Sequence, residues 1–159
     1  MILGSSYSSG LFDPAKLHRN VIQWAQQLTD WQNVHGRIGA LAVRGSSGLG
    51  AAMPLSFFTG VPVIYVRKPL EKEPTHGRPV EGPFEVNPKT FLIFDDTIAT
   101  GDTVRAIHQT LNDVYGMTCR GIILWQHFPS WNNTPGEPDR TYSLPGGPVP
   151  VWHWQQKED

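Results

Sequence analysis

Two adjacent carboxylates, Asp95 and Asp96, end an apolar run of strand length in this chain. A short loop with Thr100, Gly101 and Thr103 follows them, and then an amphipathic helical pattern begins. Consecutive apolar residues suit a strand that is covered on both faces, and glycine permits the backbone of a tight turn. The N–H groups of such a loop and of the helix start form an anion site, most simply for a phosphate. Because the two carboxylates can accept hydrogen bonds from a vicinal diol, the stretch outlines a site for a ribose 5-phosphate.

The stretch Asp95-Asp-Thr-Ile-Ala-Thr-Gly-Asp-Thr103 resembles the phosphoribosyl-diphosphate (PRPP) motif of type I phosphoribosyltransferases, and so does the apolar strand before it. The resemblance implies that Asp95 and Asp96 are catalytic and hold the ribose hydroxyls. It implies that the 5-phosphate of PRPP is bound by Ile98, Ala99, Thr100, Gly101, Asp102 and Thr103. The alternative is an ordinary strand-to-helix turn capped by an aspartate, but a cap needs neither the acidic pair nor the two threonines.

A second turn suited to anions follows the strand expected over residues 38–43 and precedes a small-residue helix. It resembles the diphosphate-binding loop of the same family, in particular that of adenine phosphoribosyltransferases. The diphosphate-binding residues implied are Arg44, Gly45, Ser46, Ser47 and, at the end of a later strand, Lys68. For Lys68 and its neighbour Arg67, a solvated strand end is the other explanation. The two turns together match PRPP, which carries one monophosphate and one diphosphate.

Alternating strand and helix patterns predict an α/β fold with a single parallel sheet flanked by helices. We expect strands at 38–43, 61–66, 90–94, 119–125 and 149–154, and helices at 13–33, 49–58 and 103–115. A Rossmann-like core with strand order 2-1-3-4-5 would bring both anion turns to the topological switch point, where such sheets bind ligands. In the last strand, the alternation of Val149, Val151 and His153 with their neighbours predicts one buried face.

The length of 159 residues predicts one domain. We expect a core over about 36–125 and a small hood formed by residues 1–35 and 126–159. In the family, the hood and the segment after the fourth strand contact the nucleobase, so Trp125, His127 and Phe128 are candidates for base binding. Packing in the core is the commoner explanation for such aromatic residues.

Residues 69–89 have no helix or strand period. A connection of that length is commonly a lid or disordered. The family resemblance favours a lid that closes over PRPP and excludes water. The candidates for its closing contacts are Lys72, Glu73, His76 and Arg78, and for His76 an exposed loop histidine is the commoner explanation.

The net charge of −1 and the pI near 6.6 argue against general nucleic-acid binding. The single cysteine, Cys119, excludes an internal disulfide and fits a reducing compartment. The start of the chain shows no signal-peptide pattern, and no run is long enough to span a membrane. We therefore expect a cytoplasmic protein that binds neither nucleic acid nor membrane.

The resemblance implies transfer of the 5-phosphoribosyl group of PRPP to a nucleobase, with release of diphosphate. Mg²⁺ is the implied cofactor, held mainly by the diphosphate and water and by Asp95 and Asp96, directly or through water. A homodimer is also implied. The alternative is a non-catalytic regulator of the same fold that binds PRPP or nucleotides, and a relative using another diphosphorylated ribose donor is a third possibility.

Two positions depart from the family pattern. Ala99 stands where enzymes for 6-oxopurines carry an acidic residue, which argues against hypoxanthine and guanine and leaves the base open. Asp102 stands where many members have an uncharged or basic residue. A carboxylate there would repel the phosphate unless its side chain points outward.

Overall fold

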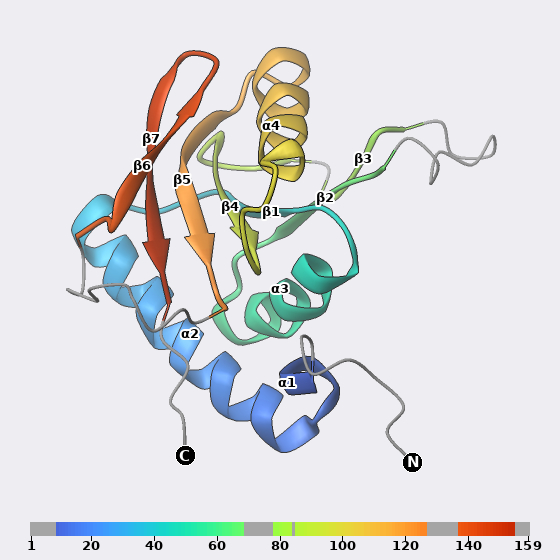
Figure 1. Ribbon diagram of the computed structural model, residues 1–159, viewed down its shortest axis with the longest axis vertical. Coiled ribbons are helices and arrows are strands. Elements are labelled where there is room, and N and C mark those ends of the chain that lie inside the picture. The colour runs from blue at the N-terminus through green and yellow to red at the C-terminus, as the bar shows by residue number, and fades with distance from the viewer. Residues whose placement is uncertain (1–8, 69–77, 84, 127–136, 155–159) are drawn as a thin grey trace.

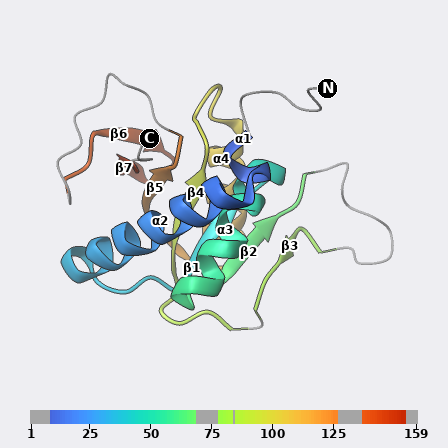
Figure 2. The same ribbon diagram turned by 90° about the horizontal axis from the view of Figure 1, so that it is seen from below.

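The computed structural model describes residues 9–68, 78–83, 85–126 and 137–154, arranged as a sheet between two layers of helices (Figure 1). Helices α2 (Pro14–His35) and α3 (Ser46–Thr59) cover one face of the sheet, and the short helix α1 (Ser9–Phe12) packs against these two helices (Figure 2). The other face carries α4 (Asp102–Gln109), which continues as a wider π-helical turn, η3 (Thr110–Val114). Among the described helices, none combines the length and the hydropathy needed to cross a bilayer.

The sheet has seven strands in the order β3-β2-β1-β4-β5-β7-β6. Their bounds are β1 (Ala40–Val43), β2 (Val63–Val66), β3 (Val80–Glu81), β4 (Thr90–Asp95), β5 (Thr118–Leu124), β6 (Arg140–Leu144) and β7 (Gly147–His153). The predicted α/β class and the predicted order of the five parallel strands, here β2-β1-β4-β5-β7, are confirmed. The prediction of a sheet with parallel strands alone is wrong, because β3 and β6 add an antiparallel strand at each edge.

Helix α2 begins where the sequence predicts. The side chain of Asp13 accepts hydrogen bonds from the N–H groups of Ala15 (2.9 Å) and Lys16 (3.1 Å), and Pro14 occupies the first helical position. The helix then buries Val21, Trp24, Leu28 and Trp31 against the sheet. Although the prediction assigns this helix to a hood, its apolar face is part of the main core, and the division of the chain into core and hood stays a prediction.

The strands are buried on both faces, as their apolar runs predict. Alternate residues of β4 point to opposite layers. Phe94 packs in the core cluster between the sheet and helices α2 and α3, and Ile93 packs in the cluster between the sheet and α4. Both side chains are fully buried. The end of β4, which carries the acidic pair, is therefore fixed by packing from both sides.

The expectation of one buried face for the last strand is wrong. Val151, Trp152 and His153 are buried in succession, because β7 lies between β5 and β6 and has a helix layer on each face. The Trp152 ring packs edge-on against that of Trp31, with ring centroids 5.5 Å apart. The described part of the tryptophan-rich C-terminal segment thus belongs to the core between α2 and the sheet.

Candidate active site

The two anion turns of the sequence meet at one edge of the sheet. They follow β1 and β4, which are parallel neighbours paired through Ala42 and Ile93, so both strands end at the same edge. A cavity of about 230 Å³ lies there. Its lining includes all the residues predicted for the two phosphate groups and the acidic pair: Arg44, Gly45, Ser46, Ser47, Lys68, Asp95, Asp96, Ile98, Ala99, Thr100, Gly101, Asp102 and Thr103.

The acidic pair forms one wall of this cavity. Asp95 and Asp96 are 5% and 8% exposed, respectively. The N–H of Asp96 donates to Asp95 Oδ1 (3.0 Å), and the N–H of Thr97 donates to Asp96 Oδ1 (2.7 Å). One oxygen of each carboxylate is thus occupied by the backbone. The second oxygen of each can accept a further hydrogen bond or bind a cation.

The burial of Asp95 gives its carboxyl group an unusual affinity for a proton. Removal from water, together with the charge of Asp96, raises the pKa of Asp95 from 3.8 to about 7, against the opposing effect of Lys68. Near neutral pH the group is close to its midpoint of ionisation. A cation or a polarised diol that favours the carboxylate would complete the ionisation.

The last residue of the loop before α4 has a backbone conformation that only glycine adopts readily. Gly101 has φ of 80°, and a Cβ atom there would lie 1.8 Å from Tyr142 Oη of β6. The loop therefore turns tightly into α4, and the N–H groups of the first helical turn have no intrahelical acceptors. This arrangement suits a bound phosphate.

Asp102, the first residue of α4, is held by two neighbours. Thr100 Oγ1 donates to Asp102 Oδ2 (2.8 Å), and Arg105 Nη2 donates to Asp102 Oδ1 (2.6 Å). These two interactions, that of Thr100 first, lower the pKa of Asp102. Sequence reasoning missed Arg105, although its spacing of three residues from Asp102 on a helix was a usable signal. Tyr142 gave no such signal, because it comes from a distant strand.

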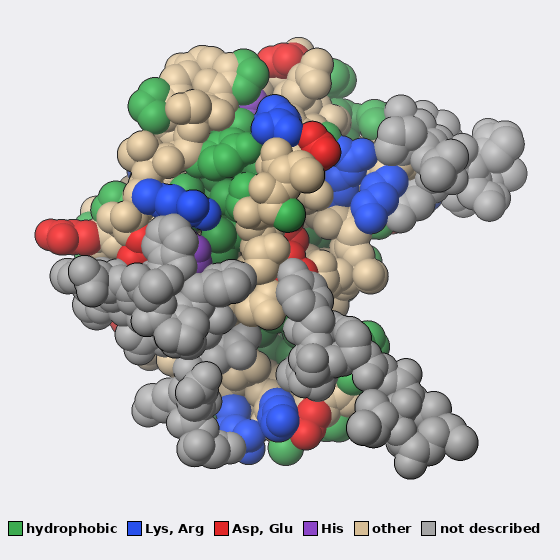
Figure 3. Space-filling view, viewed as in Figure 1, with side chains coloured by type: hydrophobic (Ala, Val, Ile, Leu, Met, Phe, Trp, Pro, Cys, Tyr) green, Lys and Arg blue, Asp and Glu red, His purple; other side chains and the backbone are tan. Residues whose placement is uncertain are grey.

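The diphosphate loop is built around Gly45, which precedes α3. Lys68 lies over this loop: its Nζ atom is 3.6 Å from the position of a Cβ atom on Gly45. The first turn of α3 also approaches the acidic pair, because a Cβ atom on Gly48 would lie 3.6 Å from Asp95 Oδ1. In Figure 3, Lys and Arg side chains gather beside the start of α4, next to acidic ones.

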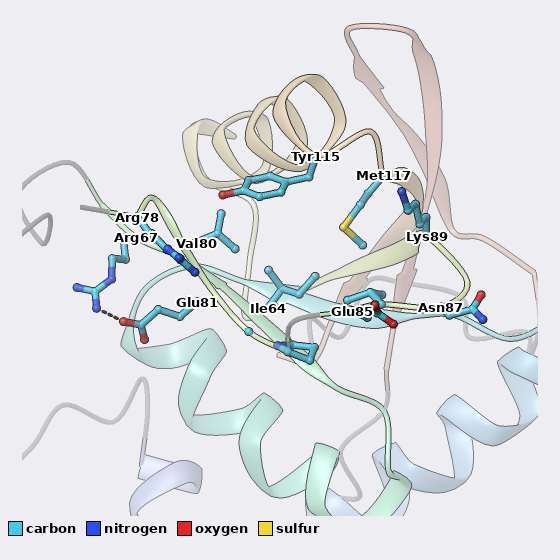
Figure 4. Close-up of a pocket in the computed structure, with 13 residues that line it drawn as sticks. Ile64, Arg67, Arg78, Val80, Glu81, Glu85, Asn87, Lys89, Tyr115 and Met117 are labelled. Carbon is cyan, nitrogen blue, oxygen red and sulfur yellow. Dashed lines mark hydrogen bonds and ion pairs between the residues drawn. The ribbon is translucent and has the colours of Figure 1, made fainter. Parts of the chain in front are cut away.

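Arg67 belongs to a different part of the surface. Its guanidinium group forms an ion pair with Glu81 of β3 (Figure 4). Both residues border a larger hollow of about 1120 Å³, which also includes Arg78, a candidate for lid closure. This hollow lacks the acidic pair and both anion loops, so the smaller cavity is the candidate active site. The other lid candidates, Lys72, Glu73 and His76, lie outside the described residues.

The base-binding candidates are placed only in part. Trp125 is buried in the core, where its ring centroid is 5.5 Å from that of Trp24. This position fits the packing explanation and does not support contact with a base. His127 and Phe128 lie outside the described residues.

Within the described ranges, no group of three or more His, Cys, Asp or Glu side chains could hold a metal ion. Asp95 and Asp96 nevertheless present two carboxylates to the cavity, and carboxylate oxygens are the ligands that Mg²⁺ prefers. Mg²⁺ is commonly bound by one or two carboxylates together with substrate phosphates. The residues therefore fit an ion that arrives with a phosphorylated substrate.

No protein-family model matches this chain, and no curated protein matches it in sequence. Solved structures do match its fold. Orotate phosphoribosyltransferase from Francisella tularensis superposes with a TM-score of 0.54 at 15% identity, over 72% of this chain. UMP synthase from Leishmania donovani superposes with a TM-score of 0.51 at 19% identity, over 75% of this chain. Adenine phosphoribosyltransferase from Thermoanaerobacter pseudethanolicus superposes with a TM-score of 0.50 at 21% identity, over 72% of this chain.

The chain has the phosphoribosyltransferase fold. This finding confirms the fold implied by the PRPP-like motif. The matched part covers 54% of the orotate enzyme, 24% of UMP synthase and 70% of the adenine enzyme. At these identities the likeness shows the phosphoribosyltransferase fold alone.

Proposed function

We propose that this protein is a phosphoribosyltransferase, which transfers the 5-phosphoribosyl group of PRPP to a ring nitrogen of a nucleobase and releases diphosphate. One observation carries the proposal: two separate anion loops and a buried acidic pair line a single cavity at the carboxyl edge of β1 and β4. A monophosphate site alone would need only one of these loops. The acidic pair between them matches the diol of a ribose.

In this proposal each end of PRPP has its own part of the cavity. The 5-phosphate lies on the loop before α4, and the diphosphate lies on the loop before α3 beside Arg44 and Lys68. The ribose ring then lies over Asp95 and Asp96, which accept hydrogen bonds from its hydroxyl groups. Binding of the two phosphates far from the reacting carbon fixes the position of that carbon.

The reaction exchanges one bond at C1 of the ribose. The bond between C1 and the diphosphate oxygen breaks, and the diphosphate leaves with the electron pair. The lone pair of the base nitrogen forms the new bond, and the proton of that nitrogen passes to water. The carboxylates of Asp95 and Asp96 favour the positive charge that develops on the ribosyl group, and Arg44 and Lys68 favour the charge on the leaving diphosphate.

Mg²⁺ belongs to the proposal as the cofactor, and when bound it would supply positive charge to the departing diphosphate. Asp95 and Asp96 would hold it, directly or through water. A homodimer and a cytoplasmic location are further parts of the proposal. Sedimentation of the purified chain tests the dimer.

Incubation with PRPP, Mg²⁺ and a panel of nucleobases tests the activity, with diphosphate release as the readout. We expect release with one base, and because of Ala99 we expect none with hypoxanthine or guanine. The double variant Asp95→Asn, Asp96→Asn should reduce turnover by a factor of about 10² or more, since it removes the charge that favours the ribosyl cation. Asp113→Asn, an exposed change on η3, is the matched control and should retain turnover.

Unchanged turnover in the double variant would show that the assigned role of the acidic pair is wrong. Binding of PRPP without diphosphate release from any base would favour a non-catalytic sensor over the enzyme. Release of diphosphate from an analogue donor, and none from PRPP, would keep the reaction type and change the donor.

A further inference from the structure

The cavity contains a charge that conflicts with a phosphate ligand. Asp102 lines it and is the first residue of α4, where the 5-phosphate would bind under the proposed function. A carboxylate next to a bound phosphate repels it, and because the Asp102 side chain is 78% exposed, water screens part of this repulsion. A phosphate can bind there only if the side chain of Asp102 points outward or another group offsets its charge.

Arg105 is placed to remove it. Both carboxylate oxygens of Asp102 are engaged, Oδ1 by Arg105 Nη2 (2.6 Å) and Oδ2 by Thr100 Oγ1 (2.8 Å). The same Arg105 Nη2 donates to the carbonyl oxygen of Thr100 (2.9 Å). One guanidinium group therefore neutralises the carboxylate and ties it to the backbone of the phosphate loop.

The sheet edge holds this guanidinium group from a third direction. Arg105 Nη1 donates to Tyr142 Oη (3.1 Å), and Tyr142 projects from β6 against the core below α4. The phenol also packs on Gly101, because a Cβ atom there would collide with it. The acceptors of Arg105 thus come from the loop, from α4 and from β6. Arginine reaches them through two nitrogens of its rigid planar fork, a geometry that the compact ammonium group of lysine does not match.

We infer that Arg105 is a positioning residue of the 5-phosphate site, held by Tyr142, which neutralises Asp102 so that the loop can accept a phosphate. This inference rests on the proposed function and adds to it two residues outside the PRPP-like motif. It also explains how this chain tolerates an acidic residue in that motif.

The other explanation is a surface ion pair that stabilises the start of α4 and does nothing for a ligand. Arg105 and Asp102 are 48% and 78% exposed in their side chains, and an exposed pair at this spacing contributes little to stability. The two explanations make different predictions. A stabilising pair affects unfolding, whereas a neutralising group affects the affinity for phosphates and leaves unfolding nearly unchanged.

The test measures the affinity of the full chain for ribose 5-phosphate and for PRPP by calorimetry, in four variants. Arg105→Ala should weaken both ligands by about tenfold, because it leaves the charge of Asp102 uncompensated. Adding Asp102→Asn to it should restore most of the loss. Adding Asp113→Asn instead changes the net charge by the same amount at a distant surface and should restore nothing. Tyr142→Phe, which removes one acceptor of Arg105, should give a smaller loss than Arg105→Ala.

Two further readouts separate positioning from folding. If turnover is present, Arg105→Ala should raise the KM for PRPP and change kcat little, and its thermal unfolding should stay close to that of the wild type. Should Arg105→Ala fold poorly, Arg105→Lys keeps the charge and tests the same site, with an expected affinity between those of the wild type and the alanine variant.

The inference is overturned if Arg105→Ala binds ribose 5-phosphate as the wild type does, or if Asp113→Asn restores the loss as well as Asp102→Asn. These outcomes differ from a failure of the proposed function. A wild type that binds ribose 5-phosphate but never releases diphosphate contradicts the transferase and leaves the role of Arg105 measurable. A wild type that binds neither ligand contradicts both.

Discussion

Asp95 ends β4 with its carboxyl group buried beside the carboxyl group of Asp96. The same burial that raises its pKa to about 7 also makes its ionisation unfavourable for folding. Under the proposed function, in which Asp95 acts as a carboxylate, the same group therefore reduces the stability of the folded chain at neutral pH. This conflict is typical of residues that act in chemistry rather than in packing.

The sign of the pH dependence follows from the two pKa values of Asp95. The unfolded group has a pKa of 3.8 and the folded group a pKa of about 7, so between these values the folded state binds more protons. Stability therefore falls as the pH rises from about 4 to about 7, and the effect of this group is constant above that range.

Asp95→Asn removes this effect. In metal-free buffer at pH 8 we expect the variant to be more stable than the wild type by on the order of 2–4 kcal/mol, with the difference shrinking towards pH 4. Urea unfolding at several pH values measures it, with Asp113→Asn as the control. A variant less stable than the wild type at pH 8 would contradict the buried, partly protonated state of Asp95.

At the scale of the elements, the turn from β4 into α4 is fixed by one glycine and by the β6–β7 hairpin beside it. Gly101 has a left-handed backbone, and Tyr142 leaves no room for a side chain on it. Gly60, at the end of α3, is also left-handed, but no atom lies within 4 Å of its Cβ position. The two glycines differ in surroundings and not in backbone type.

Gly101→Ala should therefore destabilise the chain more than Gly60→Ala. Backbone strain alone costs on the order of 1 kcal/mol in both variants. Gly101→Ala adds the collision with Tyr142, and it should also abolish ribose 5-phosphate binding because the loop must shift. Thermal unfolding and calorimetry measure the two effects. Equal destabilisation of both variants would mean that the tyrosine moves aside without consequence.

Across the molecule, one cluster of tryptophans joins helix α2 to the strands near the C-terminus. Trp24 of α2 is fully buried, and its ring centroid lies 5.9 Å from that of Phe94 and 5.5 Å from that of Trp125. Phe94 directly precedes Asp95. The position of the acidic pair thus depends on packing by a helix that begins far from it in the sequence.

Trp24→Ala should destabilise the chain by about 3–5 kcal/mol, because it leaves a large cavity below the sheet. Phe57→Ala removes an aromatic ring that is 86% exposed on α3 and should change stability by less than about 0.5 kcal/mol. Urea unfolding compares the two. A small effect of Trp24→Ala would show that α2 is not part of the main core.

The sequence predicted the parallel core and the residues of the cavity because both depend on local patterns. Apolar runs, a capping aspartate and glycine turns each lie within a few residues of the elements they define. The edge strands β3 and β6 were missed, since β3 has only two residues and the alternation of Tyr142 and Leu144 with polar residues in β6 is too short to stand out in a turn-rich segment. The contact between Arg105 and Tyr142 joins residues 37 positions apart, and only the folded sheet brings them together.

The two antiparallel strands at the edges of the sheet also affect how two copies of the chain could associate. β3 has two residues and is flanked by Pro79 and Pro83, and β6 starts with Arg140. Edge strands that are short, charged or flanked by proline resist the addition of a further strand from a neighbouring molecule. Pairing of two copies edge to edge into one continuous sheet is therefore disfavoured, most of all at β3, and this favours contacts between copies through helices or loops.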